Sequence, residues 1–147
     1  MENLSVVVLA GERPIEQDHQ TANPSIFTLI AGVPTIERVI NTLSSCQQFS
    51  QILVVGPEKT KKDDSEIMKR ILAQRKVRYV EPSSGPSESA TKAFMMSDNP
   101  VLLTTADHPL LNVRIIENFV QASVENRAEF IVGLVPYEVI KNSFPES

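Results

Sequence analysis

Ser5-Val6-Val7-Val8-Leu9-Ala10-Gly11-Glu12-Arg13 is the stretch from which the rest of this chain can be interpreted. Residues 6–9 form an apolar run that is too short for a typical helix and rich in β-branched valine, which predicts a buried parallel strand. The run ends in Ala10-Gly11, two small residues that let the backbone approach a ligand closely. In open α/β sheets, a strand that ends in such a loop is where a nucleotide or other phosphate group usually binds. The stretch therefore predicts the mouth of a nucleotide site.

Size and composition narrow the class of protein. The 147 residues suffice for one domain, and 41% hydrophobic with 22% charged residues is ordinary for a globular chain. A net charge of −4 argues against nucleic acid as a partner but allows a small anionic ligand. Cys46 is the only cysteine, so neither a disulfide nor a thiolate metal cage is expected. No run is long enough to span a membrane, and Met1-Glu2-Asn3 does not begin a signal peptide, so we expect a cytoplasmic protein without a membrane partner.

Strand patterns alternate with helical patterns along the chain. Apolar residues recur at helical spacing after Pro34, over 65–73, over 86–96 and after Asn112, which suits a helix N-cap. This alternation predicts βαβ units, a mostly parallel sheet and right-handed crossovers. Strands are expected at Val6–Leu9, Ile52–Val55, Val77–Val80, Val101–Thr104 and Phe130–Val135.

Three connecting segments stand apart from this alternation. Residues 12–23 show neither helical nor strand periodicity, and a long irregular loop in a compact domain is usually functional or disordered. Residues 26–30 are apolar enough to pack back on the sheet before a turn at Ala31-Gly32. The charge run from Lys59 to Asp64 is expected to be a solvated connection.

Candidate functional residues follow the predicted strands, because ligands bind outside the carboxyl ends of parallel strands. Asp107 comes just after the strand that begins at Val101, where a carboxylate can hold Mg²⁺ against phosphate oxygens. The alternative is that Asp107 only stabilises a turn ahead of Pro109. Arg13 is either a bidentate phosphate donor or a surface arginine.

The stretch Ser84-Gly85-Pro86-Ser87 opens a predicted helix. Its N–H groups and hydroxyls either meet a base or phosphate, or form an ordinary helix start. The chain contains no Walker loop and no Gly-x-Gly-x-x-Gly fingerprint, which weakens the case for a dinucleotide dehydrogenase.

Four segments together resemble the MobA-like nucleotidyltransferase family. They cover nearly the whole chain, in the expected order and at compatible spacing, and the last is among the most specific. The resemblance implies an α/β fold of the nucleotide-diphospho-sugar transferase (GT-A) type, Rossmann-like, with three α/β/α layers and a mostly parallel sheet. The segments are Val-Val-Val-Leu-Ala-Gly-Glu-Arg-Pro at 6–14, Ile-Ala-Gly-Val-Pro-Thr-Ile-Glu-Arg-Val-Ile at 30–40, Ser-Gly-Pro-Ser-Glu-Ser at 84–89 and Leu-Leu-Thr-Thr-Ala-Asp-His-Pro-Leu-Leu at 102–111.

The resemblance implies an activity and a set of site residues. The family transfers an NMP from an NTP to a phosphorylated or otherwise anionic small-molecule acceptor and releases pyrophosphate. By resemblance, Asp107 is the Mg²⁺ ligand and acts in catalysis with Arg13. The sequence determines neither the base nor the acceptor. It also leaves the oligomeric state open, with a homo-oligomer as one alternative. The nucleotide-binding residues implied are Leu9, Ala10, Gly11 and Arg13 in the first loop, and Ser84, Gly85 and Ser87 near the base and ribose.

The chain departs from the family pattern in two respects. The family's second loop glycine is Glu12 here, and its loop lysine falls at about Ser25, with no lysine between Met1 and Gln51. A carboxylate beside a polyphosphate adds repulsion, so the alternative function is a catalytically degenerate relative that acts as a nucleotide-binding or protein-interaction domain. The other departure is length. We expect residues 1–147 to be a single NTP-transferase-like domain without the family's C-terminal acceptor-binding part.

Overall fold

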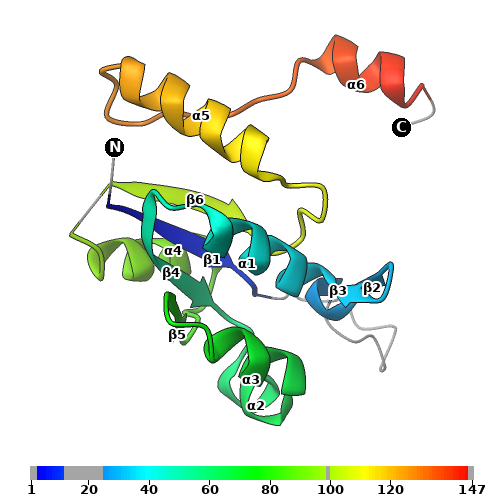
Figure 1. Cartoon of the computed structure of the whole chain (residues 1–147), viewed down its shortest axis with the longest axis vertical. Coiled ribbons are helices and arrows are strands. Elements are labelled where there is room, and N and C mark those ends of the chain that lie inside the picture. The colour runs from blue at the N-terminus through cyan, green and yellow to red at the C-terminus, as the bar shows by residue number, and fades with distance from the viewer. Residues whose placement is uncertain (1–2, 12–24, 99, 146–147) are drawn as a thin grey trace. The chain divides into compact units, whose positions relative to one another are not determined.

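The first strand, β1 (Leu4–Leu9), lies inside a four-stranded parallel sheet of order β5-β4-β1-β6 (Figure 1). The computed structural model describes residues 3–11, 25–98 and 100–145. Val6, Val7 and Val8 have no exposed surface, because β1 has a strand on each side and is covered on both faces. The other three strands are β4 (Phe49–Val55), β5 (Val77–Val80) and β6 (Val101–Thr105), which confirms four of the strands expected from the sequence.

The order of the strands decides which helices cover which face. The chain runs outward from β1 through α1 (Thr35–Ser45) and β4, then through α3 (Glu66–Leu72) to β5. It then returns through α4 (Pro86–Met95) to β6, on the other side of β1. Right-handed crossovers therefore place α1 and α3 on one face and α4 on the opposite face. The direction of winding reverses between β1 and β6, which is the topological switch point of the sheet.

The core has two parts that follow the alternation of side chains along β1. Val7 lies on the face that α4 covers, where Ala93 of α4 belongs to the same buried cluster. Val6 and Val8 lie on the other face, toward α1. The fully buried apolar residues of α1 recur at helical spacing, as the sequence predicts, and are Ile36, Val39, Ile40 and Leu43.

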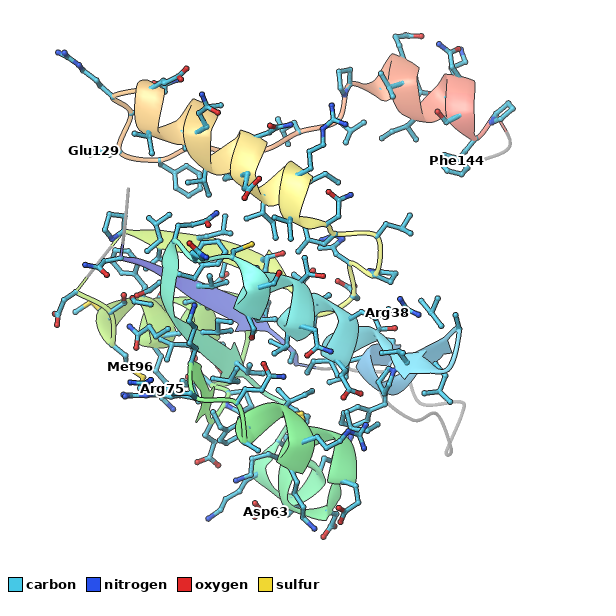
Figure 2. All side chains as sticks on the ribbon, in the orientation of Figure 1. Arg38, Asp63, Arg75, Met96, Glu129 and Phe144 are labelled. Carbon is cyan, nitrogen blue, oxygen red and sulfur yellow. The ribbon has the colours of Figure 1, made fainter. Side chains whose placement is uncertain are left out.

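A short hairpin precedes α1. The strands β2 (Leu29–Ile30) and β3 (Val33–Pro34) pair antiparallel around Ala31-Gly32, whose φ angles of 49° and 77° suit a tight two-residue turn. Arg38 of α1 donates from Nε to the carbonyl oxygen of Ile30 at 3.0 Å, which ties the hairpin to the helix (Figure 2).

The structure corrects the expectation that residues 26–30 pack back on the sheet. Ile26, in the 3₁₀ turn η1 (Ser25–Phe27), is buried, and this turn lies against α1. Leu29 is 63% exposed and Ile30 is 39% exposed. The hairpin between the turn and α1 uses these two residues as a strand, so they do not reach the sheet.

The structure also corrects the expectation of a plain connection at Lys59–Asp64. These residues form a short helix, α2, none of whose side chains is buried, so the run is solvated as expected but helical (Figure 2). The Nζ atom of Lys62 lies 4.6 Å from the centre of the Tyr79 ring on β5. This cation–π contact is tertiary, so local charge patterning could not reveal it.

The ion pair between α1 and α3 predicts that acid weakens the fold. Arg70 donates to both carboxylate oxygens of Glu37, at 3.1 and 2.9 Å, and these hydrogen bonds lower the pKa of Glu37 although burial opposes the shift. Because the pKa of Glu37 is lower in the folded state than its unfolded value near 4.5, the ionised carboxylate stabilises the fold at pH values above 4.5. This stabilisation is lost as the pH falls through the folded-state pKa. Urea unfolding of Glu37→Gln should therefore show a loss relative to wild type at about pH 7 that shrinks at about pH 3. Glu66→Gln, which breaks an exposed pair within α3, is the control and should have a smaller effect at pH 7.

The chain divides into two compact units, Met1–Val113 and Arg114–Ser147. The second unit contains α5 (Val113–Glu125) except its first residue, and all of α6 (Tyr137–Ser143).

The predicted strand at Phe130–Val135 is wrong, because these residues form no strand. A strand needs a hydrogen-bonding partner, and none of the described residues pairs with this run. Its side chains stay largely exposed, Phe130 by 82% and Leu134 by 83%. No helix in the described ranges has the length and apolar character needed to cross a bilayer.

Candidate active site

Pairing between β1 and β6 brings the first loop and Asp107 to one edge of the sheet. Leu9 is in register with Thr105, and the N–H of Ala106 donates to the carbonyl oxygen of Leu9 at 2.9 Å. The N–H of Ala10 donates to the carbonyl oxygen of Val55 at 2.8 Å, which continues the β1–β4 ladder. The first residue beyond these bonds, Gly11, has open space where a side chain would stand. Its backbone is therefore accessible to a ligand at the switch point.

Asp107 follows β6 directly and is exposed. Thr105 donates from Oγ1 to Oδ1 of Asp107 at 2.5 Å, which orients the carboxylate. Among the described residues, no group of three or more His, Cys, Asp or Glu side chains could enclose a metal ion. Mg²⁺ is commonly held by one or two carboxylates together with substrate phosphates and water, and Asp107 provides one exposed carboxylate. The donor chemistry at Asp107 therefore fits that ion, and the turn at 106–107 is compatible with the role.

The loop between β5 and α4 has a fixed backbone. The N–H of Ser83 donates to Oγ of the buried Ser89 at 2.9 Å, and Lys92 donates from Nζ to the carbonyl oxygen of Glu81 at 2.8 Å. Ser84 donates from Oγ to a carboxylate oxygen of Glu88 at 2.5 Å. Two of these bonds from α4 thus fix the loop's backbone, at Glu81 and Ser83, and the third ties the side chain of Ser84 to the helix.

The nucleotide-binding residues expected in this loop lie at the start of α4. Gly85 is the N-cap and Pro86 the first helical residue, as the sequence predicts. Ser84 and Ser87 are exposed. The structure thus places all three expected residues, Ser84, Gly85 and Ser87, at the carboxyl edge of the sheet.

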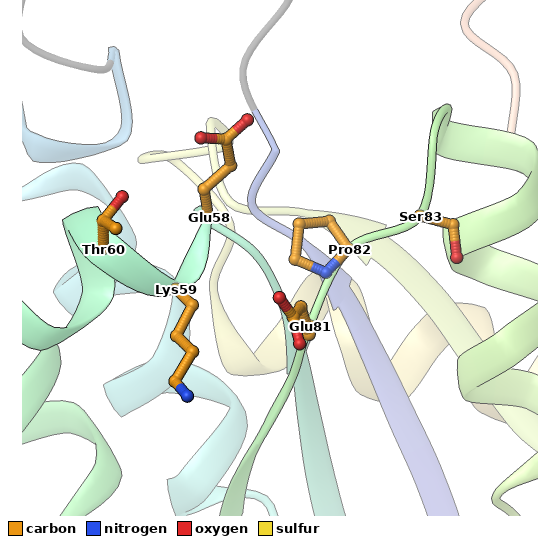
Figure 3. A pocket seen from close by; sticks show the side chains of 6 residues that line it. All are labelled: Glu58, Lys59, Thr60, Glu81, Pro82 and Ser83. Atoms are coloured by element: carbon orange, nitrogen blue, oxygen red, sulfur yellow. The ribbon is translucent and has the colours of Figure 1, made fainter.

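A groove of about 320 Å³ lies beside this loop, at the carboxyl ends of β4 and β5 (Figure 3). Two carboxylates and one ammonium group line it, so it suits an uncharged polar group better than a phosphate. The residues on its β4 side are not among the predicted site residues, although they come shortly after the predicted strand Ile52–Val55. The lining residues are Glu58, Lys59, Thr60, Glu81, Pro82 and Ser83.

Two residues of the predicted first loop, Glu12 and Arg13, lie outside the described residues. Ser25, where the family's loop lysine is expected, is described and exposed at the start of η1. The described part of the predicted site therefore consists of its β1 end, the start of α4 and Asp107.

A mostly parallel sheet with a small-residue loop and a carboxylate at its switch point defines an α/β protein of the open-sheet class, in which ligands bind at that edge. Residues 6–138 match the family described as the MobA-like NTP transferase domain. The chain belongs to this family.

Three solved structures, among others, share this fold. A hypothetical transferase from Thermus thermophilus has a TM-score of 0.70 and 18% identity, and the match covers 100% of this chain and 57% of that protein. The 4-diphosphocytidyl-2C-methyl-D-erythritol synthase from Anaerococcus prevotii has a TM-score of 0.65 and 17% identity, and the match covers 93% of this chain and 60% of that protein. A cytidylyltransferase from Leptospira borgpetersenii has a TM-score of 0.65 and 14% identity, and the match covers 87% of this chain and 51% of that protein. The chain thus has a GT-A-like fold and spans between half and three-fifths of the length of these proteins.

Proposed function

We propose that this protein is a Mg²⁺-dependent nucleotidyltransferase that transfers an NMP from an NTP to a phosphorylated or anionic small-molecule acceptor and releases pyrophosphate. The observation that carries the proposal is the register of Leu9 with Thr105, which brings Gly11 and Asp107 to the switch point together. Membership of a nucleotidyltransferase family over residues 6–138 supports it.

The proposed reaction needs no protein nucleophile, because the acceptor attacks the α-phosphorus in line. The backbone of Leu9, Ala10 and Gly11 would hold the triphosphate close to the sheet, and Arg13 would donate to it. Asp107 would hold Mg²⁺, which supplies positive charge where negative charge develops. Positioning and charge neutralisation would account for most of the rate enhancement.

The groove beside Ser83 is the proposed place for the base. It adjoins the loop that contains Ser84, Gly85 and Ser87, and its carboxylates can accept from the amino group of a base. One similar solved structure is named a cytidylyltransferase and another a 4-diphosphocytidyl-2C-methyl-D-erythritol synthase, so CTP is the first nucleotide to test.

The experiment is calorimetric titration of the full chain with each NTP, with and without Mg²⁺, followed by a pyrophosphate-release assay across phosphorylated and anionic acceptors. Mg²⁺-dependent binding of an NTP and acceptor-dependent pyrophosphate release are expected. If no NTP binds, both nucleotidyl transfer and simple nucleotide binding are ruled out.

A second candidate, a catalytically degenerate nucleotide-binding or protein-interaction domain, has its own test. It is favoured by Glu12 in place of a glycine and by the absence of a lysine before Gln51. Glu12→Gly with Ser25→Lys should lower the Kd for NTP about tenfold or more, because a repulsive carboxylate is lost and a cation gained beside the phosphates. Asp98→Gly with Ser45→Lys makes the same charge change at the amino edge of the sheet and should leave the Kd unchanged. No gain from the first pair would show that this loop does not contact phosphate.

A further inference from the structure

The backbone at the end of β4 is in close contact with the backbone at the end of β1. Gly56 follows β4 with φ +93°, and its N–H donates to the carbonyl oxygen of Val80 at 3.1 Å. A Cβ atom placed on Gly56 would lie 2.9 Å from the carbonyl carbon of Ala10 and 2.9 Å from the nitrogen of Gly11. Both neighbours are main-chain atoms, so no side-chain rotation could relieve the overlap. Only glycine fits here without moving residues 10–11.

Tyr79 of β5 holds the next residue of this segment. Its hydroxyl donates to the carbonyl oxygen of Pro57 at 2.7 Å, and Lys62 lies over its ring. Burial, with a smaller contribution from the carboxylate of Glu81, raises the pKa of Tyr79, so the hydroxyl remains a donor at neutral pH. Two hydrogen bonds to β5, one at the carbonyl oxygen of Val80 and one at the hydroxyl of Tyr79, therefore hold the Gly56-Pro57 segment against residues 10–11.

We propose that Gly56, held in place through Tyr79, is a positioning residue for the backbone of Ala10 and Gly11. Its close contact determines the position of these two residues at the edge of the proposed nucleotide site. Neither Gly56 nor Tyr79 lines the groove or lies at the switch point, so they act on a ligand only through the loop. The effect on nucleotide affinity rests on the proposed function, whereas the effect on residues 10–11 rests on the contact alone.

Gly32 provides a matched control for Gly56. It also has a positive φ, +77°, so alanine is strained at both positions, but a Cβ on Gly32 meets nothing within 4 Å. Gly32→Ala therefore reproduces the backbone strain without the displacement of a neighbour. Any difference between the two variants at residues 10–11 reports the close contact.

The experiment measures the amide signals and hydrogen exchange of Ala10 and Gly11 by NMR, and the Kd for CTP–Mg²⁺ and for the other NTPs, in wild type, Gly56→Ala and Gly32→Ala. In Gly56→Ala, we expect both amide signals to shift, exchange at Ala10 to accelerate, and the Kd to rise about tenfold or more, since displacements of about 1 Å in a site are costly. Gly32→Ala should leave all three quantities as in wild type, although its thermal stability falls.

Tyr79→Phe keeps the proposal testable if Gly56→Ala does not fold. Loss of the hydroxyl should accelerate exchange at Ala10 and raise the Kd by a smaller factor, while Tyr137→Phe, at an exposed tyrosine, changes neither. The proposal would be overturned if the amide signals and hydrogen exchange of Ala10 and Gly11 were unchanged in folded Gly56→Ala. If only Tyr79→Phe folds, the same result in that variant would overturn it. An unchanged Kd for the NTP would overturn it too. If the amides respond but wild type binds no NTP, the positioning of the loop is supported and the proposed function fails.

Discussion

Asp107→Asn should abolish Mg²⁺-dependent binding of the NTP and lower kcat/KM for nucleotidyl transfer by at least about 100-fold. The variant removes the negative charge at the carboxyl end of β6 but keeps an oxygen that can accept from Oγ1 of Thr105. Because the position is exposed and the acceptor for Thr105 is retained, we expect the fold to stay intact, so that a loss of binding reports the missing negative charge. The measurements are calorimetry with and without Mg²⁺ and the pyrophosphate assay.

The control for this prediction is Asp98→Asn, which removes an exposed carboxylate just before β6, at the amino edge of the sheet. It should leave both binding and turnover unchanged, and its thermal unfolding should match that of Asp107→Asn. If Asp107→Asn binds NTP–Mg²⁺ like wild type, Asp107 is not a metal ligand and acts only in the turn.

Phe49→Ala should lower the free energy of unfolding by about 3–5 kcal/mol, a large part of the stability of an ordinary domain. Phe49 begins β4, has no exposed surface and is the largest of the fully buried side chains in the described residues. It pairs in register with Leu4 of β1, so the cavity would open beside the central strand. Urea unfolding followed by circular dichroism measures the loss.

Phe94→Ala makes the same chemical change on α4, where the side chain is 56% exposed. Its effect should stay within about 0.5 kcal/mol, because little packing is lost and alanine favours the helix. Similar losses in the two variants would mean that burial at Phe49 does not govern the stability of this sheet.

Local patterns predicted those elements that are covered by apolar surface. The parallel strands are buried on both faces, so each appears as a continuous apolar run, and Val77–Val80 has the bounds that the sequence predicts. The helix after Pro34 was recognisable because its buried residues recur at helical spacing. The same logic failed at Phe130–Val135, because an apolar run becomes a strand only with a partner for its hydrogen bonds.

The candidate site likewise contains residues that local patterns predict and residues that only tertiary contacts reveal. Ala10-Gly11 and Asp107 could be predicted as candidates because each directly follows a recognisable strand, and parallel strands end at a common edge. The β4 side of the groove could not be predicted, since Lys59 and Thr60 begin a charge run that is typical of solvent-exposed connections, and Glu58 directly precedes it. It becomes part of a groove only because β5 lies beside β4 and brings Glu81 to its other side.

The amino-acid order alone thus establishes an α/β chain with a small-residue loop after its first strand, because burial and backbone freedom are properties of short segments. Tertiary structure decides which strand ends meet. The register of Leu9 with Thr105 places Asp107 near that loop, and the contact of Gly56 with Ala10 limits where the loop can stand. Both depend on atoms more than 40 residues apart, and the distance between such atoms is a property of the folded sheet rather than of any local pattern.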